Sequence, residues 1–206
     1  PMRSLSAAEI VARAPAPLQK GVTVDLTGLD VHEPLVLTER DLANLDFSGS
    51  TFHAPVRLAG ARFLGLAWFG NCRFHSAFDA SRAVFHNDLR AEDCLFYQDF
   101  TCARAEFRGV ACFDRSDFHG PAHLDRLTCY GNLSLDHAVF RAPVSLQNSE
   151  FLGGIWCDST EFRIRADFRD VEVHGRTWVR QASVGKENAA RSSSLRQISS
   201  YGLQWL

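Results

Sequence analysis

Apolar residues recur along this chain at fixed intervals of 11 residues. From residue 52 to residue 173 every eleventh position is apolar, and ten of these twelve positions carry Phe. The twelve are Phe52, Phe63, Phe74, Phe85, Phe96, Phe107, Phe118, Cys129, Phe140, Phe151, Phe162 and Val173. A small or apolar residue precedes most of them by two positions, as Ala61 precedes Phe63. Residues at i and i+2 share one face of an extended segment but not of a helix, so the pattern predicts very short strands.

A second pair of apolar positions lies between these, so that inward residues recur after alternately five and six residues. The two members of this pair exchange volume, since Ala67 is followed by Phe69 and Phe78 by Ala80. Such an exchange fills a slot of constant size, as a close-packed interior requires. A fixed short period of this kind predicts a solenoid, in which the inward residues of one coil stack on those of the next.

The repeating units resemble those of the pentapeptide-repeat family, in which a small residue, a polar residue and Phe or Leu are followed by two variable residues. Ala61-Arg62-Phe63, Ala83-Val84-Phe85 and Ala138-Val139-Phe140 carry the resemblance, which covers about residues 41 to 179. It implies an all-β, right-handed quadrilateral β-helix. Every second unit has one residue more than the family repeat, which implies coils of 22 residues, about six coils in total, and Phe96 directly above Phe74.

The two ends depart from the repeat, and they divide the chain into three parts. Residues 1–40 are expected to form an N-terminal cap helix and an irregular first coil, 41–179 the β-helix, and 180–206 a C-terminal cap or tail. Ser6 and Glu9 fit a capping box for a helix over residues 4–14. A second short helix is expected from Asn188 to Ile198. Six glycines in one phase of the repeat, such as Gly131, are expected to supply unusual backbone angles at corners.

Composition narrows the functional classes. The net charge of −2 and the pI of about 6.5 do not favour direct nucleic-acid binding. No apolar stretch reaches the length of a membrane span. The six cysteines form no CxxC pair, and five occupy inward phases, with only Cys112 expected to point outward. Buried free thiols favour a reducing compartment, so a cytoplasmic location is expected. No motif indicates a cofactor or a catalytic residue.

Histidines follow several of the main Phe positions. With 22 residues per coil, His53, His75 and His119 share one edge column with Tyr97. Imidazoles on adjacent rungs could bind a metal or an anion, with His53 and His75 as the ligands. No third ligand is evident in the sequence, and half-buried rings also suit a corner ladder. The ladder interpretation is therefore preferred, and no metal site is predicted.

Two further columns are candidate interaction surfaces. Glu106, Glu150 and Glu172 share one outward face, on which Thr128 interrupts the charge. Trp156 and Trp178 share another, and exposed aromatic side chains mark contact surfaces. The C-terminal tail, or a second subunit, is expected to cover the Trp pair.

These features favour a non-enzymatic protein-binding or scaffold module whose partner is an unidentified protein. The alternative, implied by the family resemblance, is a DNA mimic that binds DNA gyrase or another type II topoisomerase and protects it from inhibitors. A homodimer through a terminal cap is a further expectation. An enzyme is disfavoured because no long insertion that could carry catalytic groups lies between Phe47 and Val179.

Overall fold

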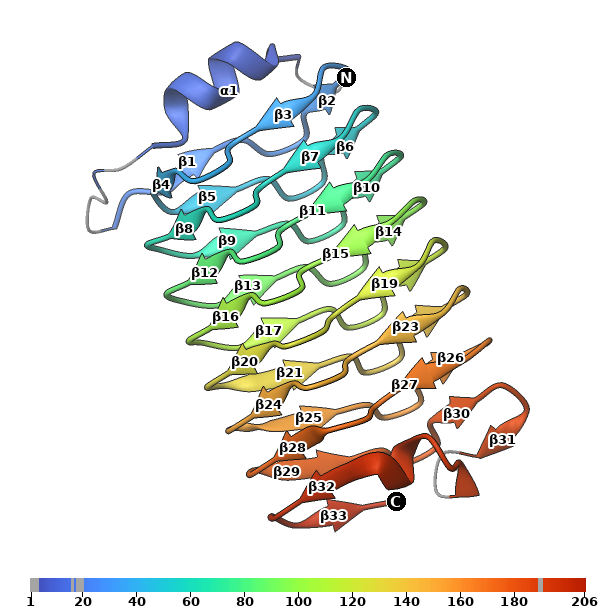
Figure 1. Ribbon diagram of the computed structural model, residues 1–206. Coiled ribbons are helices and arrows are strands. Elements are labelled where there is room, and N and C mark those ends of the chain that lie inside the picture. The colour runs from blue at the N-terminus through green and yellow to red at the C-terminus, as the bar shows by residue number, and fades with distance from the viewer. Residues whose placement is uncertain (1–3, 16, 18–20, 189–190) are drawn as a thin grey trace.

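The chain folds into a right-handed parallel β-solenoid with four flat faces (Figure 1). The computed structural model describes residues 4–15, 17, 21–188 and 191–206. The predicted fold class is confirmed. The solenoid has about seven turns, one more than predicted. The difference arises because strands of the four sheets already begin at Val24 and continue to Trp205, beyond the repeat region at both ends.

Four parallel sheets form the faces, and each strand is only two or three residues long. The tryptophan face contains β1 (Val24–Asp25), β5 (Leu45–Asp46), β9 (Ala67–Trp68), β13 (Leu89–Arg90), β17 (Ala111–Cys112), β21 (Asn132–Ser134), β25 (Gly154–Trp156), β29 (Arg176–Trp178) and β33 (Gln204–Trp205). The histidine face contains β2 (Asp30–Val31), β6 (Thr51–Phe52), β10 (Arg73–Phe74), β14 (Leu95–Phe96), β18 (Asp117–Phe118), β22 (Val139–Phe140), β26 (Glu161–Phe162), β30 (Ser183–Val184) and the antiparallel β31 (Glu187–Asn188).

The remaining two sheets close the quadrilateral. The glutamate face contains β4 (Asp41–Leu42), β8 (Arg62–Phe63), β12 (Val84–Phe85), β16 (Glu106–Phe107), β20 (Thr128–Cys129), β24 (Glu150–Phe151), β28 (Val171–Val173) and β32 (Ile198–Ser200). The fourth face contains β3 (Leu35–Val36), β7 (Val56–Arg57), β11 (Phe78–Asp79), β15 (Phe100–Thr101), β19 (Ala122–His123), β23 (Val144–Ser145) and β27 (Ala166–Asp167).

The register of the sheets confirms the predicted coil length. Phe74 pairs with Phe96, and Phe85 pairs with Phe107, so residues 22 apart lie on adjacent rungs. The first coil is one residue shorter, because Asp30 pairs with Thr51. Continuous backbone hydrogen bonds between coils satisfy the peptide groups of strands that are too short to be stable alone.

Stacked phenylalanines fill the interior. Phe74 and Phe96 stack with ring centroids 4.8 Å apart and planes 5° from parallel. The seven Phe side chains predicted to be buried are at most 2% exposed: Phe63, Phe74, Phe85, Phe96, Phe107, Phe140 and Phe151. The core prediction is therefore confirmed.

The corners are built differently from the expectation. A left-handed residue recurs every 11 positions in the turn of each five-residue unit, and from residue 71 onward it is not Gly: Asn71, Arg82, Asp93, Arg104, Arg115, Arg126, His137, Asn148, Ser159, Asp170 and Gln181. Gly131, Gly153 and Gly175 are not left-handed. They lie at another corner, where a Cβ would overlap the carbonyl oxygen of the glycine one coil below. Close backbone approach, rather than an unusual angle, therefore requires these glycines.

The two ends are covered in different ways. The N-terminal helix α1 (Ala7–Arg13) lies across the first coil and buries Ile10 (Figure 1). Its predicted capping box is present, since Glu9 N donates to Ser6 Oγ at 3.2 Å and Ser6 N to Glu9 Oε2 at 2.8 Å. None of the helices in the described part of the chain is long and apolar enough to cross a membrane.

The helix expected from Asn188 to Ile198 is wrong. Asn188 ends β31 and Ile198 begins β32, and the short 3-10 helix η2 (Leu195–Gln197) lies between them; positions 189 and 190 lie outside the described residues. After this excursion β32 and β33 add a last rung to the glutamate and tryptophan faces. Parallel strands, and not a helical cap, therefore extend this end of the solenoid.

Candidate functional site

An aromatic ladder occupies the C-terminal part of the tryptophan face. The rings of Trp156 and Trp178 lie 5.5 Å apart, and those of Trp178 and Trp205 lie 4.9 Å apart. All three side chains are half-buried. The guanidinium groups of Arg180 and Arg176 lie over the rings of Trp178 and Trp205, at 5.8 and 5.6 Å. The C-terminal segment thus supplies the third ring of the ladder, and all three tryptophans stay partly exposed.

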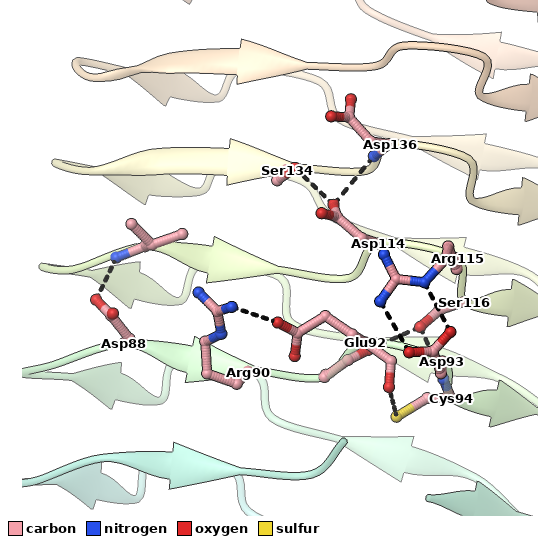
Figure 2. Close-up of polar contacts among 12 residues, drawn as sticks. Asp88, Arg90, Glu92, Asp93, Cys94, Asp114, Arg115, Ser116, Ser134 and Asp136 are labelled. Carbon is pink, nitrogen blue, oxygen red and sulfur yellow. Dashed lines mark hydrogen bonds and ion pairs between the residues drawn. The ribbon is translucent and has the colours of Figure 1, made fainter. Parts of the chain in front are cut away.

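A carboxylate ladder lies beside the aromatic ladder, and the sequence analysis did not identify it. It consists of four residues spaced by 22, at the turn that follows each strand of the tryptophan face: Glu92, Asp114, Asp136 and Asp158. Asp136 N donates to Asp114 Oδ1 at 3.1 Å (Figure 2). Asp158 N donates to Asp136 Oδ1 at 2.8 Å. The two middle carboxylates, Asp114 and Asp136, therefore each accept a backbone hydrogen bond from the next coil.

Arginines pair with the two ends of the carboxylate ladder. Arg90 contacts Glu92 at 2.6 Å, and Arg180 contacts Asp158 at 3.3 Å. In the middle, Ser134 Oγ donates to Asp114 at 2.5 Å (Figure 2). Burial raises the pKa of Asp136, and the like charges of Asp114 and Asp158 raise it further. The centre of the ladder is therefore the part that a cation from a partner would stabilise most.

Two shallow hollows line the tryptophan face between the aromatic positions. The larger, about 500 Å³, is bounded by Trp68, Asp88 and Arg90. The smaller, about 230 Å³, is bounded by Arg90, Asp114 and Trp156. Arg90 lines both hollows, so they form one interrupted groove along the face. The indole Nε1 of Trp156 is buried and has no hydrogen-bond partner among the described residues.

Cys112 lies in an outward phase, as expected, but it is buried. Its exposed fraction is only 4%. Arg90 and Ser134, its partners on the rungs before and after, line the same hollow as Cys112, as does Trp156 one rung further on. Burial raises the pKa of its thiol to about 12, so Cys112 is protonated and unreactive at neutral pH. All six cysteines are free and buried.

The glutamate face brings Glu106, Glu150 and Glu172 into one column, with Thr128 between the first two. All three carboxylates of this column have side-chain partners. Arg108 contacts Glu106 at 2.6 Å. His174 Nε2 lies 3.2 Å from Glu150 and 3.5 Å from Glu172.

The histidine column forms a continuous ring stack at the edge of the histidine face. His53 stacks on His75 at 5.1 Å, and Tyr97 separates His75 from His119, at 4.8 and 5.1 Å. The structure adds His32, whose ring lies 4.2 Å from that of His53. The shorter first coil conceals this neighbour from a 22-residue count.

Comparisons with known proteins do not extend this picture. No family model matches the chain, and no curated protein matches it in sequence. The four-faced parallel solenoid is consistent with a pentapeptide-repeat fold, and the candidate surfaces rest on the geometry described above.

Proposed function

We propose that this protein is a non-enzymatic scaffold that binds another protein through its tryptophan face. The observation that carries the proposal is the pairing of an aromatic ladder with a carboxylate ladder on the same face. Rungs about 4.8 Å apart repeat the two kinds of contact along one line. Aromatic side chains contribute strongly to protein interfaces because they bury a large area at a small cost in side-chain entropy.

The partner expected from this chemistry presents basic side chains in line with apolar ones. A Lys or Arg placed between Asp114 and Asp136 would offset the repulsion that raises the pKa of Asp136. Because the carboxylates are half-exposed, salt should weaken the association. The backbone of the face is held by hydrogen bonds on both sides, so binding requires little ordering of the scaffold.

Site-specific photocrosslinking in the native cell tests this proposal. A crosslinker at Ser134 on the tryptophan face should capture a partner that a crosslinker at Thr101 on the fourth face does not capture. The purified partner is then titrated against the double variant Asp114→Asn/Asp136→Asn, which should bind about tenfold more weakly or worse. The control Asp79→Asn/Asp167→Asn removes two charges from the fourth face. Equal effects of the two double variants would overturn the proposal.

A second candidate is the DNA mimic that protects a type II topoisomerase such as gyrase. The observation favouring it is the carboxylate ladder, which is longer than the column of Glu106, Glu150 and Glu172. Paired arginines at both ends of the ladder weaken the resemblance to a phosphate backbone. We therefore expect no protection of gyrase from a quinolone in a supercoiling assay at physiological salt. Dose-dependent protection that is abolished by Asp114→Asn/Asp136→Asn would place the mimic first.

Self-association through a terminal coil stays a prediction. Tyr201, Leu203 and Leu206 in the last coil are each more than 60% exposed, and two copies could bury them together. Sedimentation equilibrium of the protein and of Leu203→Glu would test this expectation.

A further inference from the structure

Three potential metal ligands converge at the start of the histidine column. Asp30 Oδ1 lies 2.7 Å from His53 Nε2, and Asp30 Oδ2 lies 3.2 Å from His32 Nε2. The donor atoms of all three residues lie within 4.8 Å of one another. The rings of His32 and His53 are stacked and nearly parallel, with an interplanar angle of 4°. The Nε2 atoms of His32 and His53 therefore face the same carboxylate, that of Asp30.

The solenoid backbone holds these three residues in place. Asp30 and His32 flank the inward Val31, so strand alternation directs both of their side chains outward. His53 lies on the next rung, and its backbone N donates to Val31 O at 2.8 Å. The imidazoles remain accessible, because the side chain of His32 is 68% exposed and that of His53 is 38% exposed. Small side-chain rotations can therefore adjust the donor atoms without changing the fold.

In a later coil of the same face, the equivalent positions hold an ion pair. There the carboxylate is Asp117, the histidine two residues later is His119, and the residue on the next rung is Arg141. Arg141 contacts Asp117 through two hydrogen bonds of 2.7 Å each, which supply a permanent positive charge. In the first coil, the position equivalent to Arg141 is occupied by His53, an imidazole instead of a guanidinium.

We propose that Asp30, His32 and His53 form a binding site for Zn²⁺ or a similar first-row divalent cation. Two neutral imidazoles and one carboxylate are a donor set that zinc accepts, with solvent or a partner side chain in the fourth position. Ligand atoms of a tetrahedral zinc site lie about 3.3 Å apart, given zinc–ligand bonds of about 2.0–2.2 Å. Of the two imidazole–carboxylate separations, that of His32, 3.2 Å, matches this value, and that of His53, 2.7 Å, is shorter. The cation would replace the two imidazole–carboxylate hydrogen bonds, and each neutral imidazole would then carry its proton on Nδ1.

This site differs from the one considered from sequence. His75 belongs to the ring stack but not to the cluster, so the second imidazole is that of His32. Another cluster in the described chain, Glu150 with Glu172 and His174, offers a single imidazole. Carboxylate-rich, exposed groups of that kind are less selective for zinc, because imidazole is the ligand that favours first-row transition metals over Mg²⁺ and Ca²⁺.

Zinc titration of the protein against a chromophoric chelator tests the site. We expect one Zn²⁺ per chain, and a loss of affinity of about tenfold or more in Asp30→Asn and in His32→Gln. His53→Arg is the most specific variant, because it copies the Asp117–Arg141 pairing and should fold normally while losing the cation. His75→Gln and His174→Gln are matched controls that should leave the affinity unchanged. A rise in Tm with zinc, present in the wild type and absent in His53→Arg, provides a second measurement.

Three outcomes would overturn the proposal. One is the absence of saturable zinc binding below about 100 μM in the wild type. Another is an affinity lost in His174→Gln but retained in His32→Gln, which would assign the cation to the glutamate face. The third is an equal loss in His75→Gln and His32→Gln, which would show that the ring stack as a whole, and not the cluster with Asp30, determines binding.

Discussion

At one corner of the solenoid, the space for a single Cβ atom determines which residue can be present. At the corner shared by Gly131, Gly153 and Gly175, each α-carbon faces the carbonyl oxygen of the coil below, and no space remains for a Cβ. At the turns of the five-residue units the backbone is left-handed, yet Arg, Asp and His occupy it. Such residues cost some strain there, and the hydrogen-bonded coils on both sides impose the conformation.

Gly131→Ala tests the requirement for close approach. The new methyl group would overlap Gly109 O, so we expect the free energy of unfolding to fall by about 1–3 kcal/mol. Gly70→Ala is the matched control, because a Cβ at that position would lie 3.9 Å from its nearest neighbour, at ordinary contact distance. Chemical denaturation of both variants provides the measurement, and equal stabilities would contradict the explanation.

Asp136→Asn tests how much partial burial and the like charges of Asp114 and Asp158 lower the stability of the folded protein. The folded pKa of Asp136 lies above its ordinary value of 3.8. Its contribution to stability is therefore complete below pH 3.8 and is lost as the pH rises through the folded pKa. An Asn oxygen can still accept the hydrogen bond from Asp158 N. At pH 7 we expect Asp136→Asn to be more stable than the wild type by less than about 1 kcal/mol, because solvent screens this half-exposed group.

The pH dependence separates this effect from a change in packing. The difference in Tm between Asp136→Asn and the wild type should vanish near pH 3, where the wild-type carboxyl is protonated. A difference that is independent of pH would show that the substitution acts through packing and not through charge.

At the scale of the element, a strand of two residues acquires its stability from its neighbours. Phe85 in β12 stacks on Phe63 at 4.7 Å and on Phe107 at 5.0 Å, so each ring fills a space between two rungs. The rungs cannot move together to close a gap, because the backbone hydrogen bonds fix their separation.

Phe85→Ala should therefore lower the free energy of unfolding by about 3–5 kcal/mol. The control Val84→Ala changes the outward residue of the same strand, whose side chain is half-buried, and should have a much smaller effect. Equilibrium denaturation in urea checks both. A loss below about 1 kcal/mol in Phe85→Ala would contradict the stacked-coil explanation.

At the scale of the whole molecule, each coil contacts chiefly the coil before it and the coil after it. The stability of such an array is close to a sum of coil terms and neighbour terms, so the ends open before the centre. Native-state hydrogen exchange should show the slowest amides in the central coils, such as those of Phe107 and Phe118. The antiparallel β31, with both residues exposed, should exchange fastest among the strands. Uniform protection from β2 to β31 would contradict this description.

The sequence by itself determined the solenoid, the coil length and the core. The reason is that the inward positions repeat at a constant spacing, so each coil fills the interior in the same way. Phe85 and Phe107, for example, occupy equivalent places 22 residues apart. The N-terminal capping box was also local and therefore visible in the sequence. The columns of Glu and Trp followed from the same arithmetic.

Only the tertiary structure decided where the 22-residue period is interrupted and which side chains the interruption brings together. The first coil is one residue shorter, which places His32 beside His53, and the last rung follows its neighbour by 27 residues, from Thr177 to Gln204. The carboxylate ladder lies in turns, whose side-chain directions no strand alternation predicts. Burial of Cys112 depends on side chains of adjacent rungs. In each case the result depends on contacts between coils, whereas the periodic pattern specifies only which residues face inward.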